Sequence, residues 1–238
     1  MVRAVLSLLL VLVPALVQAG AWARGDGRAF LSFGLEAGPD TQVLTTYAEY
    51  GLSPEITLGF DGFTDLQNES LTAILFGRYT FPAEGPHVFA LGGGLGGEYR
   101  IDTREQRFVA GGPILTVDHV RSGGFLRLTA HYGRALDSGW FAADASYDVG
   151  RLESGTDPPL PDVTIGRAKL DLTYGHRASE RLAVMGQLFV YDDDQSAPSY
   201  TLEASTTYDF GVGVGVIGLK QGLEGGRPSL KLGVWRSF

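Results

Sequence analysis

The side chains that could do chemistry in this chain are acids and bases that alternate with apolar residues. Projecting every second residue of the alternating stretches onto one side collects nine acids: Glu36, Glu49, Asp61, Glu98, Asp144, Asp148, Asp171, Glu203 and Asp209. The same projection collects six bases: Arg78, Arg100, Arg127, Arg167, Lys169 and Lys231. Such groups either line a polar passage and select solutes by charge, or pair across a narrow space and close it. Both alternatives stay open here. If a passage conducts, the excess of acids predicts a preference for cations.

Nucleophilic catalysis would need a Ser and a His in hydrogen-bond contact, with a third group to orient the His. The four His are dispersed, and none has a Ser two residues later, the spacing expected of a barrel lipid hydrolase. In His119-Val120-Arg121-Ser122 the spacing is one residue too long. The sequence therefore predicts a protein that is not an enzyme, with no catalytic residues.

Two further motifs invite a ligand. Asp192-Asp193-Asp194 is rich in oxygen ligands but lacks the spacing of a calcium loop, so we expect a solvated external loop. The run Gly92 to Gly97 lacks the Lys-Ser/Thr pair of a phosphate loop, and glycine within a strand is more typical of bending. Dispersed His residues form no metal-ligand cluster. We expect no cofactor and no bound metal.

Period-two alternation positions these groups and predicts an all-β chain. It recurs in six stretches: 29–37, 70–81, 126–132, 141–149, 169–174 and 200–209. A soluble β-sandwich also alternates, but its apolar face points inward, whereas a membrane barrel turns that face to lipid. Aromatic residues favour the barrel, because they sit near strand ends as interfacial girdles do: Tyr79, Phe81, Tyr132, Tyr147, Tyr174 and Tyr208.

Connections alternate between short turns and longer polar loops, as in a transmembrane antiparallel up-and-down β-barrel. We predict twelve strands: 29–37, 42–52, 55–62, 70–81, 87–100, 124–133, 140–149, 163–175, 181–191, 200–209, 212–220 and 229–238. A strand-like stretch, Ile114 to Val117, would make thirteen and put the chain ends on opposite sides. We therefore assign 101–123 to an external loop, as a protruding extension, and keep fourteen strands as the alternative.

Both ends of the chain indicate export to an outer membrane. Arg3, the apolar run Val5 to Val17 and the small residues around Ala19 predict a signal peptide over 1–19, with 20–238 as the barrel domain. Ala21-Trp22-Ala23 offers a second cleavage site, and a retained anchor helix is the alternative, although the run is too short to span a bilayer. At the other end, Leu230, Leu232, Val234 and Phe238 share one strand face. A terminal Phe is similar to the signature that outer-membrane assembly machinery reads, with Arg236 as a departure from it.

Composition excludes several classes. The chain has no Cys, so it is not a disulfide-stapled domain. A formal net charge of −8 argues against nucleic-acid binding.

Several strand-and-turn patterns resemble the phenol-degradation meta-pathway outer-membrane family. They are Gly20 to Gly27, Tyr47 to Gly59, Gly139 to Ala142 and Lys169 to Val184. The resemblance implies a barrel and passage of small organic compounds, and it transfers no catalytic residue.

The sequence therefore predicts a porin-like outer-membrane barrel for passive passage of small solutes. The lumen-lining residues would be Glu36, Glu49, Asp61, Arg78, Glu98, Arg127, Asp144, Asp148, Lys169, Asp171 and Glu203. The expected partners are outer-membrane lipids, lipopolysaccharide, the barrel assembly machinery and small solutes. The alternatives are a sealed structural or loop-presenting barrel and, less favoured, a lipid hydrolase.

Overall fold

The computed structural model describes residues 20–39, 41–108, 114–155, 161–194 and 196–238, with the backbone alone between 102 and 118. The predicted signal segment 1–19 lies outside these residues. The described chain forms twelve strands: β1 (Ala29–Gly38), β2 (Thr41–Gly51), β3 (Ile56–Asp65), β4 (Ser70–Thr80), β5 (His87–Phe108), β6 (Ile114–Leu136), β7 (Gly139–Ser154), β8 (Val163–Arg177), β9 (Leu182–Asp193), β10 (Ser199–Asp209), β11 (Val214–Gly222) and β12 (Ser229–Ser237).

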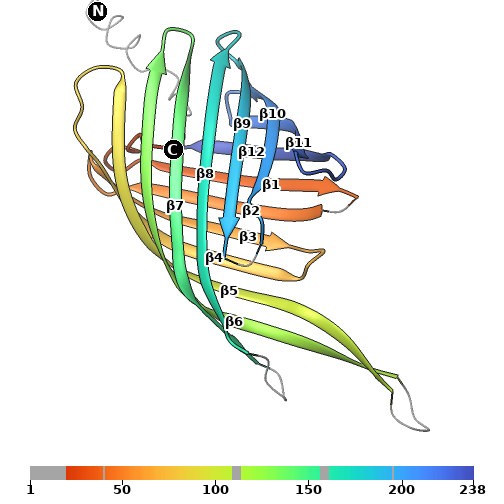
Figure 1. The fold of residues 1–238 in the computed structure, drawn as a ribbon. Helices are drawn as coiled ribbons and strands as arrows, with labels where there is room; N and C mark the ends of the chain where they lie inside the picture. The colour runs from red at the N-terminus through yellow and green to blue at the C-terminus, as the bar shows by residue number, and fades with distance from the viewer. Residues whose placement is uncertain (1–19, 40, 109–113, 156–160, 195) are drawn as a thin grey trace, which may run out of the picture.

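Every strand pairs antiparallel with its neighbours in sequence, and β1 pairs with β12, so the sheet closes into a barrel (Figure 1). At the seam Phe30 lies opposite Ser237 and Ala37 lies opposite Leu230. Closure leaves no unpaired sheet edge, which a strand in lipid could not tolerate. The predicted twelve-strand barrel is confirmed for the described residues, and fourteen strands and a two-sheet sandwich are wrong.

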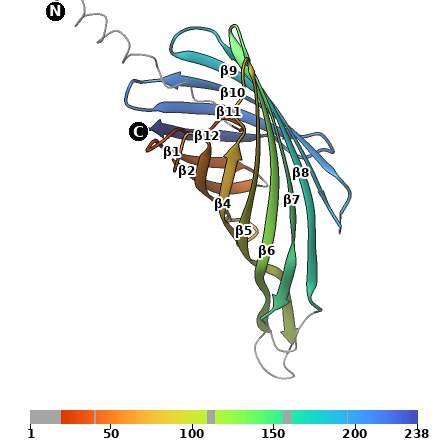
Figure 2. The same ribbon diagram turned by 90° about the vertical axis from the view of Figure 1, so that its left-hand side faces the viewer.

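The segment 101–123 differs from the prediction. We expected a protruding external loop there, but β5 continues to Phe108 and pairs antiparallel with β6 from Ile114 on, with a register shift between Ile101 and Thr103. The hairpin extends far beyond the rest of the barrel in both views (Figures 1 and 2). Few apolar residues alternate in sequence just after 101, so the local pattern alone did not predict this pairing.

Apolar side chains cover the outside of the barrel. Leu75, Leu95 and Leu128 are each about two-thirds exposed, whereas the residues next to them in sequence are more covered. Exposing so continuous an apolar surface to water is energetically unfavourable. In a bilayer the same surface contacts lipid instead of water. The described residues contain no helix that is long and apolar enough to cross a membrane.

Aromatic residues cluster at the edge of the barrel that carries the short turns and both ends of the described chain. The Tyr79 and Phe81 ring centroids are 5.2 Å apart, and those of Tyr208 and Phe210 are 4.9 Å apart. Tyr and Phe rings suit a membrane–water boundary, where one part of the residue meets lipid and another meets water.

Part of the interior is apolar. Ile74, Phe125, Leu152 and Ile165 form a buried cluster against the inner wall of β4, β6, β7 and β8. The glycines of β5 make room for it, because a Cβ on Gly96 would lie 2.2 Å from the Phe125 ring. Close packing of the wall thus requires glycine here, beyond the strand bending that the sequence suggested.

Candidate functional site: the charged interior of the barrel

The eleven residues predicted to line the lumen all lie at inward-facing positions of the closed sheet. Five of them are buried: Glu49, Arg78, Glu98, Asp148 and Glu203. Several bond to residues on strands that are not their sheet neighbours, which only inward-pointing side chains can do. Arg167 of β8, for example, reaches Glu98 of β5. The interior is therefore built as a network of charges.

The segment before β1, residues 20–25, lies inside the barrel at the short-turn edge, which the sequence reading missed. Ala21 has no exposed surface. Its carbonyl accepts a hydrogen bond from Thr80 Oγ1 (3.1 Å), and the Trp22 carbonyl accepts one from Arg78 Nη2 (3.1 Å). The Trp22 ring covers Gly133, where a Cβ would lie 2.5 Å from it. The sequence offered one signal for this position: Trp22 and Arg24 stand among small residues in a segment that would otherwise read as a linker.

Glu49 is the centre of the charge cluster at this edge. Arg78 Nη2 lies 2.8 Å from its Oε1, Arg24 Nε bonds to its Oε2, and the Tyr47 hydroxyl donates to Oε1 at 2.6 Å. Glu49 is only 3% exposed. A carboxylate this buried is stable as an ion only with such charge-assisted donors. The cluster ties the N-terminal segment to β2 and β4.

A second cluster lies across the middle of the interior. Arg127 donates to both oxygens of Asp148 through Nε (2.6 Å) and Nη2 (2.7 Å), and its Nη1 lies 3.7 Å from Asp61. The Lys169 ammonium lies 2.7 Å from Asp171. Asp61 is held more loosely. Its side chain is 42% exposed, and the 3.7 Å between its carboxylate and Arg127 Nη1 is longer than a hydrogen bond.

The remaining predicted acids are held by bases on other strands. Arg167 Nη2 donates to Glu98 at 3.0 Å, and Lys231 Nζ bonds to both Glu203 oxygens at 2.9 Å. Glu36 accepts from Lys220 Nζ at 2.8 Å and from Ser229 Oγ at 2.6 Å.

The charge balance differs from the one projected from the sequence. Arg24 and Lys220 join the interior pairs, although the projection omitted both. Asp209 instead accepts a hydrogen bond from Gly211 N (2.7 Å) and closes the β10–β11 turn. The excess of acids inside is therefore smaller than nine against six.

These groups surround a cavity of about 320 Å³ inside the barrel. Its charged wall includes Asp61, Arg127 and Lys169. Part of its wall is aromatic: the Phe30 and Tyr47 ring centroids are 6.2 Å apart, and those of Tyr47 and Phe76 are 5.8 Å apart. A space of this volume, with apolar faces and a few fixed charges, has the character of a small-molecule site.

One Ser–His contact does occur. Ser138 Oγ and His176 Nδ1 lie 3.2 Å apart, exposed at the β6–β7 turn. In the described part of the chain, no carboxylate bonds to the His176 ring, so the orienting third group of a hydrolase is missing there. The described residues also contain no group of three or more His, Asp or Glu arranged to hold a metal ion.

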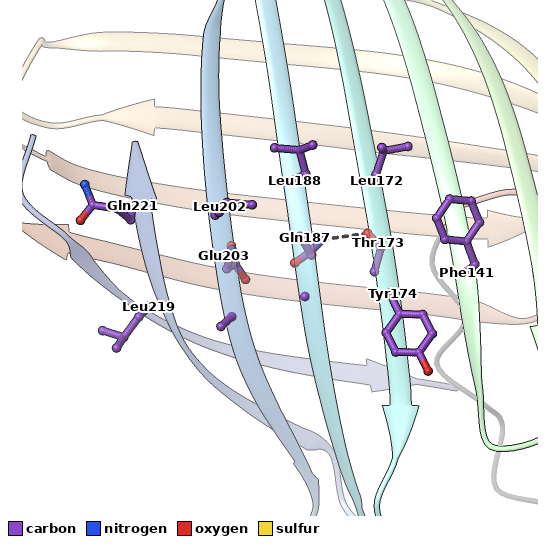
Figure 3. A pocket seen from close by; sticks show the side chains of 12 residues that line it. Phe141, Leu172, Thr173, Tyr174, Gln187, Leu188, Leu202, Glu203, Leu219 and Gln221 are labelled. Atoms are coloured by element: carbon purple, nitrogen blue, oxygen red, sulfur yellow. Dashed lines mark hydrogen bonds between the residues drawn. The ribbon is translucent and has the colours of Figure 1, made fainter. Parts of the chain in front are cut away.

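A shallow apolar groove of about 490 Å³ lies on the outside of the barrel (Figure 3). Tyr174, Leu202 and Leu219 border it and are exposed. Gly186 lies at its floor and has no side chain to fill the groove. A Cβ built there would meet nothing within 4 Å. Its apolar lining and outward position make it part of the lipid-facing surface.

Comparison with known proteins supports the fold. No family model and no curated relative matches the sequence. Among solved structures, the chain is similar to NanC porin (TM-score 0.56, 11% identity, covering 87% of this chain and 98% of that one). It is also similar to KdgM porin (TM-score 0.55, 11% identity, 88% and 99%). A third is the translocator domain of the autotransporter NalP from Neisseria meningitidis (TM-score 0.55, 14% identity, 90% and 89%). At these identities the likeness shows a shared barrel fold.

Proposed function

We propose that this protein is an outer-membrane channel for passive passage of small solutes, with small organic compounds as the substrate class. The observation that carries the proposal is the interior cavity of about 320 Å³, which combines charged groups with an aromatic wall. The aromatic faces suit apolar parts of a solute, and the charges suit its polar groups.

The proposed localisation is the outer membrane. The apolar outer surface and the barrel fold shared with two porins support it. The proposed partners are outer-membrane lipids with lipopolysaccharide, the small solutes and the assembly machinery that would read the C-terminal strand. A non-enzymatic role fits the Ser138–His176 contact, which has no third group among the described residues.

The N-terminal segment constricts the passage at the short-turn edge, because Trp22 and its neighbours fill space between opposite walls. We therefore expect low conductance from the intact protein and higher conductance when this segment is reduced. Conductance in planar bilayers tests this, with Trp22→Ala as the variant and Phe210→Ala as the control. Phe210 is an aromatic residue that is exposed at a turn.

A sealed structural barrel is the second candidate, and the dense network of ion pairs favours it. If neither the intact protein nor Trp22→Ala conducts ions or small organic solutes, the channel proposal fails and the sealed barrel replaces it. If Phe210→Ala raises conductance as much as Trp22→Ala does, the constriction is not at Trp22.

A further inference from the structure

Removal of the predicted signal peptide after Ala19 would make Gly20 the first residue of the mature chain. We propose that the α-ammonium group created by this cleavage binds the carboxylate of Asp144, on the inner face of β7. Asp144 would then be a binding site for the mature N-terminus, and cleavage would complete the charge network inside the barrel.

The first argument is the position of Gly20. A Cβ built on it would lie 2.9 Å from Oδ1 and 3.0 Å from Oδ2 of Asp144. The Asp144 carboxylate therefore lies beside the Gly20 Cα, which carries the amino nitrogen. In the uncleaved chain the φ of +87° favours glycine, and the Asp144 oxygens leave little room for a side chain at this residue.

The second argument is the partner of Asp144. Its Oδ1 lies 2.6 Å from His131 Nδ1, which leaves Oδ2 for another donor. In the described part of the chain, the lumen-lining acids other than Asp144 each have a Lys or Arg within ion-pair distance, whereas Asp144 has only this imidazole. Asp171 lies directly opposite it on β8. Asp171 is already paired with Lys169, so a cation beside Asp144 would complete the pairing of these two acids.

The third argument is that neighbouring contacts hold Gly20 in place. The carbonyls of Ala21 and Trp22 accept hydrogen bonds from Thr80 and Arg78, and Arg24 pairs with Glu49. Cleavage at the second candidate site, after Ala23, would remove two of these carbonyls and leave the Arg78 guanidinium with one partner fewer. A mature chain that starts at Gly20 keeps all of these contacts.

The experiment begins with intact-mass analysis of the protein extracted from outer membranes, where we expect a chain that starts at Gly20. The rate at which the α-amino group of the folded protein is acylated at neutral pH then reports its pairing with Asp144. We expect the α-amino group to react about tenfold faster in Asp144→Asn, because a carboxylate partner keeps an ammonium protonated. Asp209→Asn, which alters a turn carboxylate, is the control and should react like the wild type.

A cycle between Asp144→Asn and N-acetylation of Gly20, in chains refolded from residue 20, separates this pairing from a general effect on folding. Acetylation should lower the thermal unfolding midpoint of the wild type and leave that of Asp144→Asn unchanged. A mature chain that starts elsewhere, equal acylation rates, or additive effects in the cycle would overturn the proposal. Because no readout uses conductance, the result stands apart from the channel proposal.

Discussion

At the scale of residues, the carboxylates inside the barrel differ in how tightly a Lys or Arg pairs with them. Glu49 has two guanidinium partners and a tyrosine hydroxyl while it is almost fully buried, whereas Asp61 is half-exposed and loosely paired. The first arrangement stabilises the fold, because buried charges must be neutralised. The second leaves a charge that a passing solute can meet.

Glu49→Gln tests the first arrangement. The substitution leaves Arg24 and Arg78 buried without their shared anion, a loss of about 3–5 kcal/mol for a broken buried pair. We expect a lower temperature for the heat-modifiable shift in gel mobility. Glu84→Gln, at an exposed turn residue, should leave it unchanged. Equal behaviour of the two variants would contradict a structural role for Glu49.

Asp61→Asn tests the second arrangement. Since Arg24 and Lys220 join the interior pairs and Asp209 lies at a turn, the projected nine acids and six bases become eight of each, and we now expect weaker cation preference than the sequence alone predicts. Removing the exposed Asp61 charge should move the reversal potential in a salt gradient toward anion preference, and higher salt should reduce the difference by screening. Asp65→Asn, in the β3–β4 turn, is the matched control. An unchanged reversal potential would show that Asp61 does not face the solute path.

At the scale of elements, each strand separates two environments by alternation alone. In β6 Leu128 is 65% exposed on the outside, whereas its neighbour Thr129 lines the interior cavity. The same substitution at adjacent residues therefore places a charge either in lipid or beside polar groups.

Leu128→Arg should block assembly, because an arginine at the bilayer midplane costs about 2–4 kcal/mol. Thr129→Arg should be tolerated better, since its side chain can reach the interior acids. The yield of folded, heat-modifiable protein in outer membranes measures both. Similar loss from both variants would contradict the assigned sidedness of β6.

At the scale of the whole molecule, closure depends on the last strand meeting the first. Phe238 N donates to the Ala29 carbonyl at 2.9 Å, and the Arg236 guanidinium lies 4.8 Å from the Phe238 ring centroid. Phe238 is also exposed, so its ring is accessible at the barrel edge. Phe238 therefore contributes a backbone hydrogen bond to the seam and leaves its ring exposed.

Deleting Phe238 should reduce insertion into the outer membrane and cause accumulation in the periplasm, whereas Phe238→Tyr should keep an aromatic terminus and insert normally. Fractionation of cells followed by gel mobility measures both. A normal membrane yield of the deletion variant would show that insertion does not require Phe238.

The sequence by itself predicted the twelve strands, with bounds within a few residues for most of them, and it assigned an inward side to each alternating strand. Local alternation suffices for this, because one side of every strand meets lipid and the other does not. It also placed Glu49, Asp148 and Glu203 on the inner face. Only the tertiary structure decided which charges pair, because Arg167 and Glu98, or Lys220 and Glu36, are far apart in sequence and meet only when the sheet closes. Closure likewise decided the place of residues 20–25 and the strand pairing of 101–123, since neither segment carries a periodic pattern that fixes its surroundings.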